Sequence, residues 1–338
     1  MLDSWIYSEF SDTLSGIARK HTRELYVVPK EISSIADYYL KRRLRILTKE
    51  PIRVDPRLGD PLPFLALWFA DSFGLSNKLV INKLALTLSY AAIIVSIRDD
   101  LIDGRAVVDG KMASEHAQIA TANFYYDKYY SIFKAIFPSR SIFWSILCNC
   151  LNEWSRYETW SFIFNRGPKK IFNPLSQKFL VNSSRYLVAI TFPTIAAIAI
   201  LTKNQSMLNR ISKFLTDYYA GFRIADDLRD WLEDLDAPKY NQSAVIYYML
   251  SKRRSSQKFD RVSAVNMFLN RDFISRIYGT LIGFYQTAKK DAAVFRSQYL
   301  QEFMDTQIEF YTEARDTALD RRIQLNRSLI KILSKKTN

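Results

Sequence analysis

Two acidic clusters, residues 99–103 and 226–234, carry the side chains of this sequence that are best suited to chemistry. Asp99 and Asp103 end a long apolar run and lie four residues apart. On a helix this spacing places both carboxylates on one face. Mg²⁺ commonly binds through one or two carboxylates together with substrate phosphates. The first cluster therefore predicts a magnesium site at the end of a helix.

The second cluster repeats this pattern, with Asp226, Asp230 and Asp234 at intervals of four residues. An acidic run is usually a solvated helix face. Here, however, both clusters follow runs that we expect to be buried, and buried carboxylates are costly unless they are paired or bind a metal. The two clusters together therefore favour metal ions held between facing helices around a diphosphate group.

Basic side chains near the clusters are candidates for binding that diphosphate. Taken singly, each is more typical of a protein surface, but together they could bind the phosphate oxygens that the metal ions leave open. The set is Arg98, Arg185, Arg223, Arg229 and Lys239. Metal ions on a diphosphate make it a better leaving group, and an allylic substrate would then leave a carbocation that needs a dry, aromatic-lined cavity. A Ser/His or Cys/His nucleophile is not indicated, because His21 and His116 are the only histidines.

The composition indicates helices as the elements that position these residues. Of the 338 residues, 48% are hydrophobic and 14% aromatic, and only 9 are glycine. We predict an all-α, single-domain helical bundle around a central apolar cavity. Residues 1–55 are expected to form N-terminal helical segments that pack on the core, and residues 56–338 the helical domain that carries both clusters. Helices are predicted at 62–73 with Gly74 as C-cap, 76–103, 113–137, 144–160, 175–202 with a kink at Pro193, and 208–234, with a loop at 104–110.

Charge, cysteine content and apolar runs bear on partners and location. The net charge of +14 favours solubility or attraction to polyanions, and we predict no specific nucleic-acid partner. Cys148 and Cys150 stand alone, which favours a reducing, cytoplasmic location. The first residues do not resemble a signal peptide. The apolar runs 84–97 and 187–201 fall short of a spanning length, so we predict buried core helices; peripheral membrane contact stays open.

The sequence resembles the class I isoprenoid synthase superfamily, which comprises trans-prenyl diphosphate synthases and class I terpene cyclases. The resemblance covers residues 57–241 and rests on the order of two motifs, Asp99-Asp100-Leu101-Ile102-Asp103 and Gly221-Phe222-Arg223-Ile224-Ala225-Asp226-Asp227-Leu228-Arg229-Asp230. Arg185 stands where these enzymes carry a diphosphate-binding Lys. The resemblance implies a prenyl diphosphate substrate, three Mg²⁺ ions with Mn²⁺ as a substitute, and a homodimer. It also implies catalytic roles for Asp99, Asp103, Asp226, Asp230 and Arg185.

Two departures from the resembling enzymes concern their second substrate. Chain-elongating prenyltransferases bind isopentenyl diphosphate through a Gly-Lys-x-x-Arg-Pro segment and an Arg-Arg pair. Here those places read Pro56-Arg57-Leu58-Gly59-Asp60-Pro61 and Val108-Asp109. Acidic side chains there repel a second diphosphate. The departures favour an enzyme that uses one substrate.

The first hypothesis is therefore a Mg²⁺-dependent class I terpene cyclase, a lyase that ionises a linear prenyl diphosphate and cyclises the cation. A prenyltransferase with an altered second site is the alternative, and a non-enzymatic basic helical protein that binds polyanions or membranes is the third. Ala91, Ile94 and Val95, one to two turns before Asp99, are predicted to line the pocket. Their moderate size favours a chain of fifteen carbons or longer.

Overall fold

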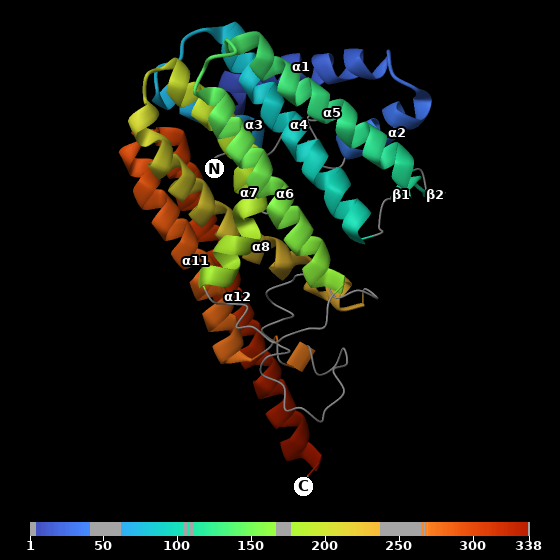
Figure 1. Ribbon diagram of the computed structural model, residues 1–338. Coiled ribbons are helices and arrows are strands. Elements are labelled where there is room, and N and C mark those ends of the chain that lie inside the picture. Colours follow the sequence, from blue (N-terminus) through green and yellow to red (C-terminus); the bar gives the residue numbers. More distant parts are fainter. Residues whose placement is uncertain are drawn as a thin grey trace.

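Long helices form nearly all of the chain that the computed structural model describes (Figure 1). The described residues are 5–40, 62–103, 107–108, 111–166, 177–236, 265–266, 268 and 270–336. The elements in chain order are α1 (Trp5–Leu25), α2 (Lys30–Tyr39), α3 (Leu62–Ser72), α4 (Lys78–Asp103), β1 (Val107–Val108), β2 (Lys111–Met112), α5 (Glu115–Ile136), α6 (Phe143–Arg166), α7 (Gln177–Leu201), η2 (Gln205–Met207), α8 (Leu208–Asp236), α11 (Arg271–Val294) and α12 (Gln298–Lys336).

The helices α4, α7 and α8 form the middle of the bundle. Helix α4 packs on α3, α5 and α7, while α7 also packs on α6 and α8. On the other side α8 packs on α11, and α11 packs on α12 (Figure 1). The predicted all-α bundle is confirmed in this arrangement, and the core side chains come from all of these helices.

Helices α4 and α7 are apolar on nearly all faces, as expected of central helices. They are longer than the apolar runs at 84–97 and 187–201, so the prediction that they fall short of a membrane-spanning length is corrected. Residues Lys78–Leu101 and Leu180–Leu201 are long and apolar enough to cross a membrane by composition. In the structure, 78% of the most apolar stretch of α4 and 72% of that of α7 are buried, as in the core helices of a bundle.

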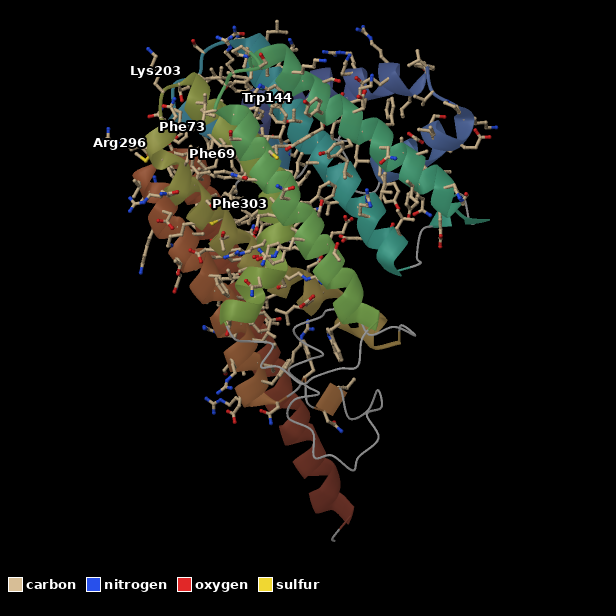
Figure 2. The ribbon with its side chains drawn as sticks, viewed as in Figure 1. Phe69, Phe73, Trp144, Lys203, Arg296 and Phe303 are labelled. Carbon is tan, nitrogen blue, oxygen red and sulfur yellow. The ribbon has the colours of Figure 1, made fainter. Side chains whose placement is uncertain are left out.

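The chain reverses direction at one end of the bundle, after α3, α7 and α11. Gly74 adopts φ 71° and its N–H donates to the carbonyl oxygen of Asp71 at 3.0 Å, which confirms it as the predicted C-cap. Lys203 and Arg296 also have positive φ, and Figure 2 shows both at this end, beside Phe73. Because α4 and α8 each start here, their acidic clusters lie at the opposite end.

The loop predicted at 104–110 contains a short hairpin instead. Strands β1 and β2 pair antiparallel, with Val107 opposite Met112 and Val108 opposite Lys111. Residues 104–106 and 109–110 lie outside the described part. Gly104 and Gly110 indicated a loop, and two strands of two residues are too short to show an alternating pattern in the sequence.

The N-terminal helices α1 and α2 are tied to α4 by buried polar contacts. His21 Nε2 lies 2.9 Å from Ser89 Oγ, and the Tyr90 hydroxyl donates to Glu24 at 2.7 Å. The Tyr39 hydroxyl donates to Asp100 at 2.8 Å. Burial lowers the pKa of His21 to about 3, so the imidazole is neutral at neutral pH. Buried polar groups need such partners, so these contacts fix how α1 and α2 lie on the core.

Replacing Gly221 tests the close approach of α8 to α11. A Cβ at Gly221 would lie 2.7 Å from Tyr285 Cε1, whereas a Cβ at Gly283, on α11, meets nothing within 4 Å. Both changes gain the same helix propensity. The difference between their free energies of unfolding therefore measures the clash of the new methyl group with Tyr285. We expect Gly221→Ala to be less stable than Gly283→Ala by about 1–3 kcal/mol in urea unfolding. Equal stability of the two variants would contradict the close contact.

The neutral His21 predicts a loss of stability in acid. Its folded pKa of about 3 lies below the ordinary value of 6.5, so the unfolded chain binds more protons between these values. The stability is complete above pH 6.5 and is lost as the pH falls toward 3. We expect His21→Gln to reduce the difference in unfolding free energy between pH 7.5 and pH 5 by about 2 kcal/mol. The exposed His116 provides the control, since His116→Gln should leave that difference unchanged.

Candidate functional site

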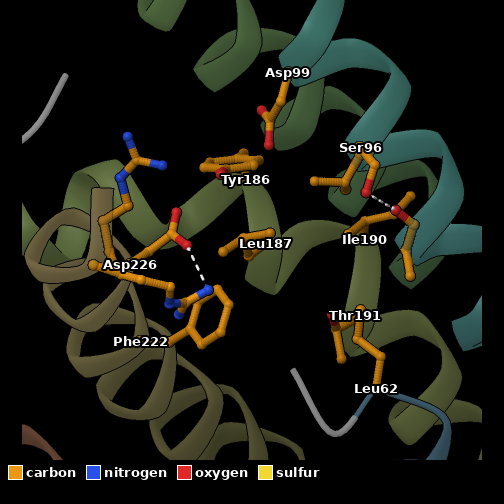
Figure 3. A pocket seen from close by; sticks show the side chains of 13 residues that line it. Leu62, Ser96, Asp99, Tyr186, Leu187, Ile190, Thr191, Phe222 and Asp226 are labelled. Carbon is orange, nitrogen blue, oxygen red and sulfur yellow. Dashed lines mark hydrogen bonds and ion pairs between the residues drawn. The ribbon is translucent and has the colours of Figure 1, made fainter. Parts of the chain in front are cut away.

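Asp99 of α4 and Asp226 of α8 line one pocket between the central helices, with Tyr186 of α7 between them in the view of Figure 3. The pocket has a volume of about 80 Å³. Its lining residues are Leu62, Ala92, Val95, Ser96, Asp99, Tyr186, Leu187, Ile190, Thr191, Phe222, Arg223, Asp226 and Arg229. The carboxylates of the two clusters thus reach a shared space from separate helices.

The pocket is charged where α4 and α8 approach their ends and apolar one or two turns further in. On α4 the lining continues from Asp99 through Val95 to Ala92, and on α8 it continues from Asp226 to Phe222. Seven residues of helix extend about 10 Å, so the lining covers that length of α4. Ligand pockets commonly hold about 300–1,000 Å³. This pocket is smaller, so a ligand of that size would fit only after the lining side chains move.

Arg223 places a positive charge beside the carboxylates. Its side chain is 18% exposed, and its Nε lies 3.7 Å from Asp227 Oδ1. Burial alone lowers the pKa of Arg223, but the negative charges of Asp227, Asp226 and Asp99 outweigh this effect and raise the pKa well above its ordinary value. The buried Nε has no hydrogen-bond partner. The pocket lining therefore contains a permanent cation beside its carboxylates.

Arg229 is the second cation of the pocket lining. Its Nη1 lies 3.5 Å from Asp226 Oδ1, and its side chain is 37% exposed, compared with 18% for Arg223. An exposed ion pair of this kind contributes little to stability. Arg229 balances part of the charge of Asp226 while remaining accessible from solvent.

Arg98 and Arg185, both predicted to bind diphosphate, lie outside the residues that line this pocket. Arg98 Nη1 lies 3.5 Å from Glu158 Oε1 of α6, with the guanidinium 5.9 Å from the centre of the Trp154 ring. Arg185 Nη1 donates to the Tyr157 hydroxyl at 3.0 Å. Both cations are thus directed to α6, and the pocket instead receives their neighbours Asp99 and Tyr186.

The predicted pocket residues divide according to helical geometry. Val95, four residues before Asp99, lines the pocket, but Ile94 and Ala91 are buried among the core side chains, 1% and 0% exposed. Residues three, four and seven before Asp99 share its face, and these are Ser96, Val95 and Ala92. The same rule applied to Asp226 gives Phe222, which the sequence reasoning missed.

Several predicted ligands fall where the structure gives no side-chain information. The backbones of Asp103, Asp230 and Asp234 lie on α4 and α8, but their side chains are outside the described set, and Lys239 lies outside the described residues altogether. Within the described side chains, no group of three metal-binding residues occurs. Asp99 and Asp226 supply the one or two carboxylates that Mg²⁺ commonly takes from a protein. The donor set therefore fits magnesium held together with a diphosphate, and three bound ions stay a prediction.

Comparison with solved structures identifies the fold. Neither a protein-family model nor a curated protein matches the sequence. A decaprenyl diphosphate synthase from Rhodobacter capsulatus superposes with a TM-score of 0.67 at 13% identity, covering 91% of this chain and 98% of that one. A geranylgeranyl pyrophosphate synthetase from the archaeon Geoglobus acetivorans gives 0.66 at 17% identity, covering 91% and 99%. A polyprenyl synthase from Caulobacter crescentus CB15, complexed with calcium and isoprenyl diphosphate, gives 0.58 at 14% identity, covering 90% and 96%. The chain has the class I isoprenoid synthase fold of the trans-prenyl diphosphate synthases.

Removing the buried cation tests the charge balance of the pocket. Arg223→Gln removes the buried positive charge beside Asp227, so we expect the free energy of unfolding to fall by about 3 kcal/mol. The matched change Arg229→Gln breaks a more exposed pair on the same helix and should cost less than about 1 kcal/mol. Urea unfolding of both variants measures the difference. If Arg223→Gln were no more destabilising than Arg229→Gln, the buried charge would not matter to the fold.

Proposed function

We propose that the chain is a Mg²⁺-dependent enzyme that acts on a prenyl diphosphate. The observation that carries the proposal is the shared pocket, where Asp99 and Asp226 meet at a charged end and apolar side chains follow behind them. A prenyl diphosphate has the same two parts, an anionic head and an apolar chain. The fold likeness to prenyl diphosphate synthases supports the same class of substrate.

The head group would lie at the carboxylates. Asp99 and Asp226 hold Mg²⁺ in this proposal, and Asp103, Asp230 and Asp234 are predicted to add ligands from the same helices. Bound magnesium neutralises the charge that develops on the departing diphosphate. Arg223 contributes a fixed positive charge at the pocket lining, so it would attract the phosphate oxygens that the metal leaves open.

The allylic chain would lie along the apolar walls. Val95, Leu187 and Phe222 exclude water from the reacting carbon, which protects a carbocation from quenching. The aromatic faces of Tyr186 and Phe222 attract positive charge at the mouth of the apolar part. These side chains therefore favour reaction of the carbocation within the pocket over its capture by water.

The fate of the cation separates two candidate activities. The solved structures of similar fold are prenyl diphosphate synthases, one of them complexed with isoprenyl diphosphate, and this supports prenyl transfer to a second substrate as the main proposal. One sequence observation favours cyclisation as the second candidate. Asp60 and Asp109 stand where the resembling synthases bind the second diphosphate through cations; both lie outside the described residues.

A substrate panel tests both activities. Purified protein with Mg²⁺ receives allylic diphosphates of ten to twenty-five carbons, with or without labelled isopentenyl diphosphate. Prenyl transfer predicts longer, labelled diphosphates; cyclisation predicts hexane-extractable hydrocarbons or alcohols without the label. We expect Asp99→Asn and Asp226→Asn to lower the rate at least about 100-fold, because each removes a charged metal ligand.

The matched control is Asp305→Asn, which removes an exposed carboxylate that pairs with Lys289 far along the chain from both clusters. This variant should retain the wild-type rate. No turnover of any allylic diphosphate by the wild type would refute the proposal. Polyanion binding that falls steeply with salt and survives both cluster variants would then favour the non-enzymatic alternative.

A homodimer and a cytoplasmic location also remain proposals. The free thiols of Cys148, which is exposed, and Cys150, which is half-buried, agree with a reducing compartment.

A further inference from the structure

Three consecutive residues at the end of α4 point in three directions. Successive side chains on a helix are about 100° apart around the axis. Arg98 contacts α6, Asp99 lines the pocket, and Asp100 contacts α2. Asp99 is therefore flanked on both sides by residues that are tied to neighbouring helices.

The tie to α2 is buried. The Tyr39 hydroxyl donates to Asp100 Oδ2 at 2.8 Å, with Tyr39 0% and Asp100 5% exposed. A hydrogen bond to an ionised carboxylate is about twice as strong as one between neutral groups. Because both partners are buried, little solvent screening weakens this bond. The contact holds the backbone of α4 at the residue that follows Asp99.

The tie to α6 holds the other side. Arg98 forms an ion pair with Glu158 and lies over the ring of Trp154. Burial raises the pKa of Glu158, and the nearby charge of Arg98 opposes that rise. The pair is half-buried, so solvent screens it more than the bond between Tyr39 and Asp100.

The end of α4 has a physical need for such ties. The last four carbonyl groups of a helix lack partners within the helix, and the helix dipole places partial negative charge there. Asp99, Asp100 and Asp103 add three carboxylates to this negative end. Repulsion among them favours fraying of the last turn, which would move Asp99 relative to Asp226.

We propose that Tyr39 and Glu158 are positioning residues that hold the last turn of α4, so that Asp99 faces Asp226 across the pocket. The N-terminal helix α2 thereby contributes to a site whose ligands lie on α4 and α8. This inference rests on the proposed function, since it assigns Asp99 a metal. Tyr39 and Glu158 act on Asp99 through its chain neighbours Asp100 and Arg98, and loss of the residues that orient a metal ligand commonly lowers metal affinity.

The variant Tyr39→Phe tests the tie, and Tyr90→Phe is its matched control. Tyr90 is also 0% exposed and donates to a buried carboxylate, that of Glu24, at 2.7 Å across the interface between α4 and the N-terminal helices. It lies nine residues before Asp99, about 13 Å along the helix. Both variants lose one buried tyrosine–carboxylate bond, so both should melt a few degrees below the wild type.

The readout is the Mg²⁺ concentration that gives half of the maximal rise in melting temperature at a fixed concentration of inorganic diphosphate. We expect this concentration to rise about threefold to tenfold in Tyr39→Phe and to stay within about twofold in Tyr90→Phe. Glu158→Gln should shift it in the same direction as Tyr39→Phe. This measurement is independent of turnover and of the identity of the prenyl chain.

The outcomes separate the inference from the proposed function. If the wild type responds to Mg²⁺ and diphosphate but Tyr39→Phe and Tyr90→Phe show equal half-saturation, Tyr39 is only structural and the inference is overturned while the proposed function stands. If the wild type shows no response to Mg²⁺ and diphosphate and turns over no prenyl diphosphate, both are overturned.

Discussion

The main electrostatic constraint on this structure is that two apolar helices place carboxylates of like charge in one pocket. Asp99 and Asp226 come from α4 and α8, whose preceding turns are buried in the core. Carboxylates in such a place repel one another and lose hydration, so they need compensating positive charge. In the protein alone Arg223 supplies part of this charge from within the pocket. Bound magnesium would supply more, which links metal binding to the stability of the pocket.

The positive charges near the pocket are divided between two tasks. Arg223 and Arg229 line the pocket and face its carboxylates, whereas Arg98 and Arg185 contact α6 through Glu158 and Tyr157. Guanidinium groups form planar, directional contacts, so a cation that is engaged with α6 also fixes the position of its own helix. The pairs on α6 thus orient α4 and α7, while the pocket cations lie beside the carboxylates of α8.

The sequence indicated the fold because its helical signals agreed with one another. Gly74 ends α3 as predicted, and the apolar runs before both clusters became central helices, each longer than its run.

The spacing of carboxylates identified which residues of α4 and α8 share a face. It could not show how far each helix is rotated toward its neighbours, because side-chain packing determines that rotation. Ile94 was therefore placed in the pocket although it is in the core, and the contacts of Arg98 and Arg185 with α6 were not foreseen. The hairpin of β1 and β2 was missed because strands of two residues leave no periodic signal.

The hydroxyl groups of the pocket wall bear on the chemistry that it allows. Ser96 and Thr191 line the apolar part, where a free hydroxyl could trap a carbocation. The Ser96 hydroxyl donates to the carbonyl of Ala92 at 2.7 Å, and Thr191 Oγ1 lies 2.9 Å from the Tyr219 hydroxyl. Both hydroxyl groups are thus hydrogen-bonded within the protein. The wall is therefore less polar toward a bound hydrocarbon chain than its serine and threonine suggest. Such a wall suits an allylic cation in prenyl transfer and in cyclisation alike. Under the proposed function, the bonded hydroxyls favour neither reaction, and the binding of a second diphosphate near the mouth would distinguish prenyl transfer from cyclisation.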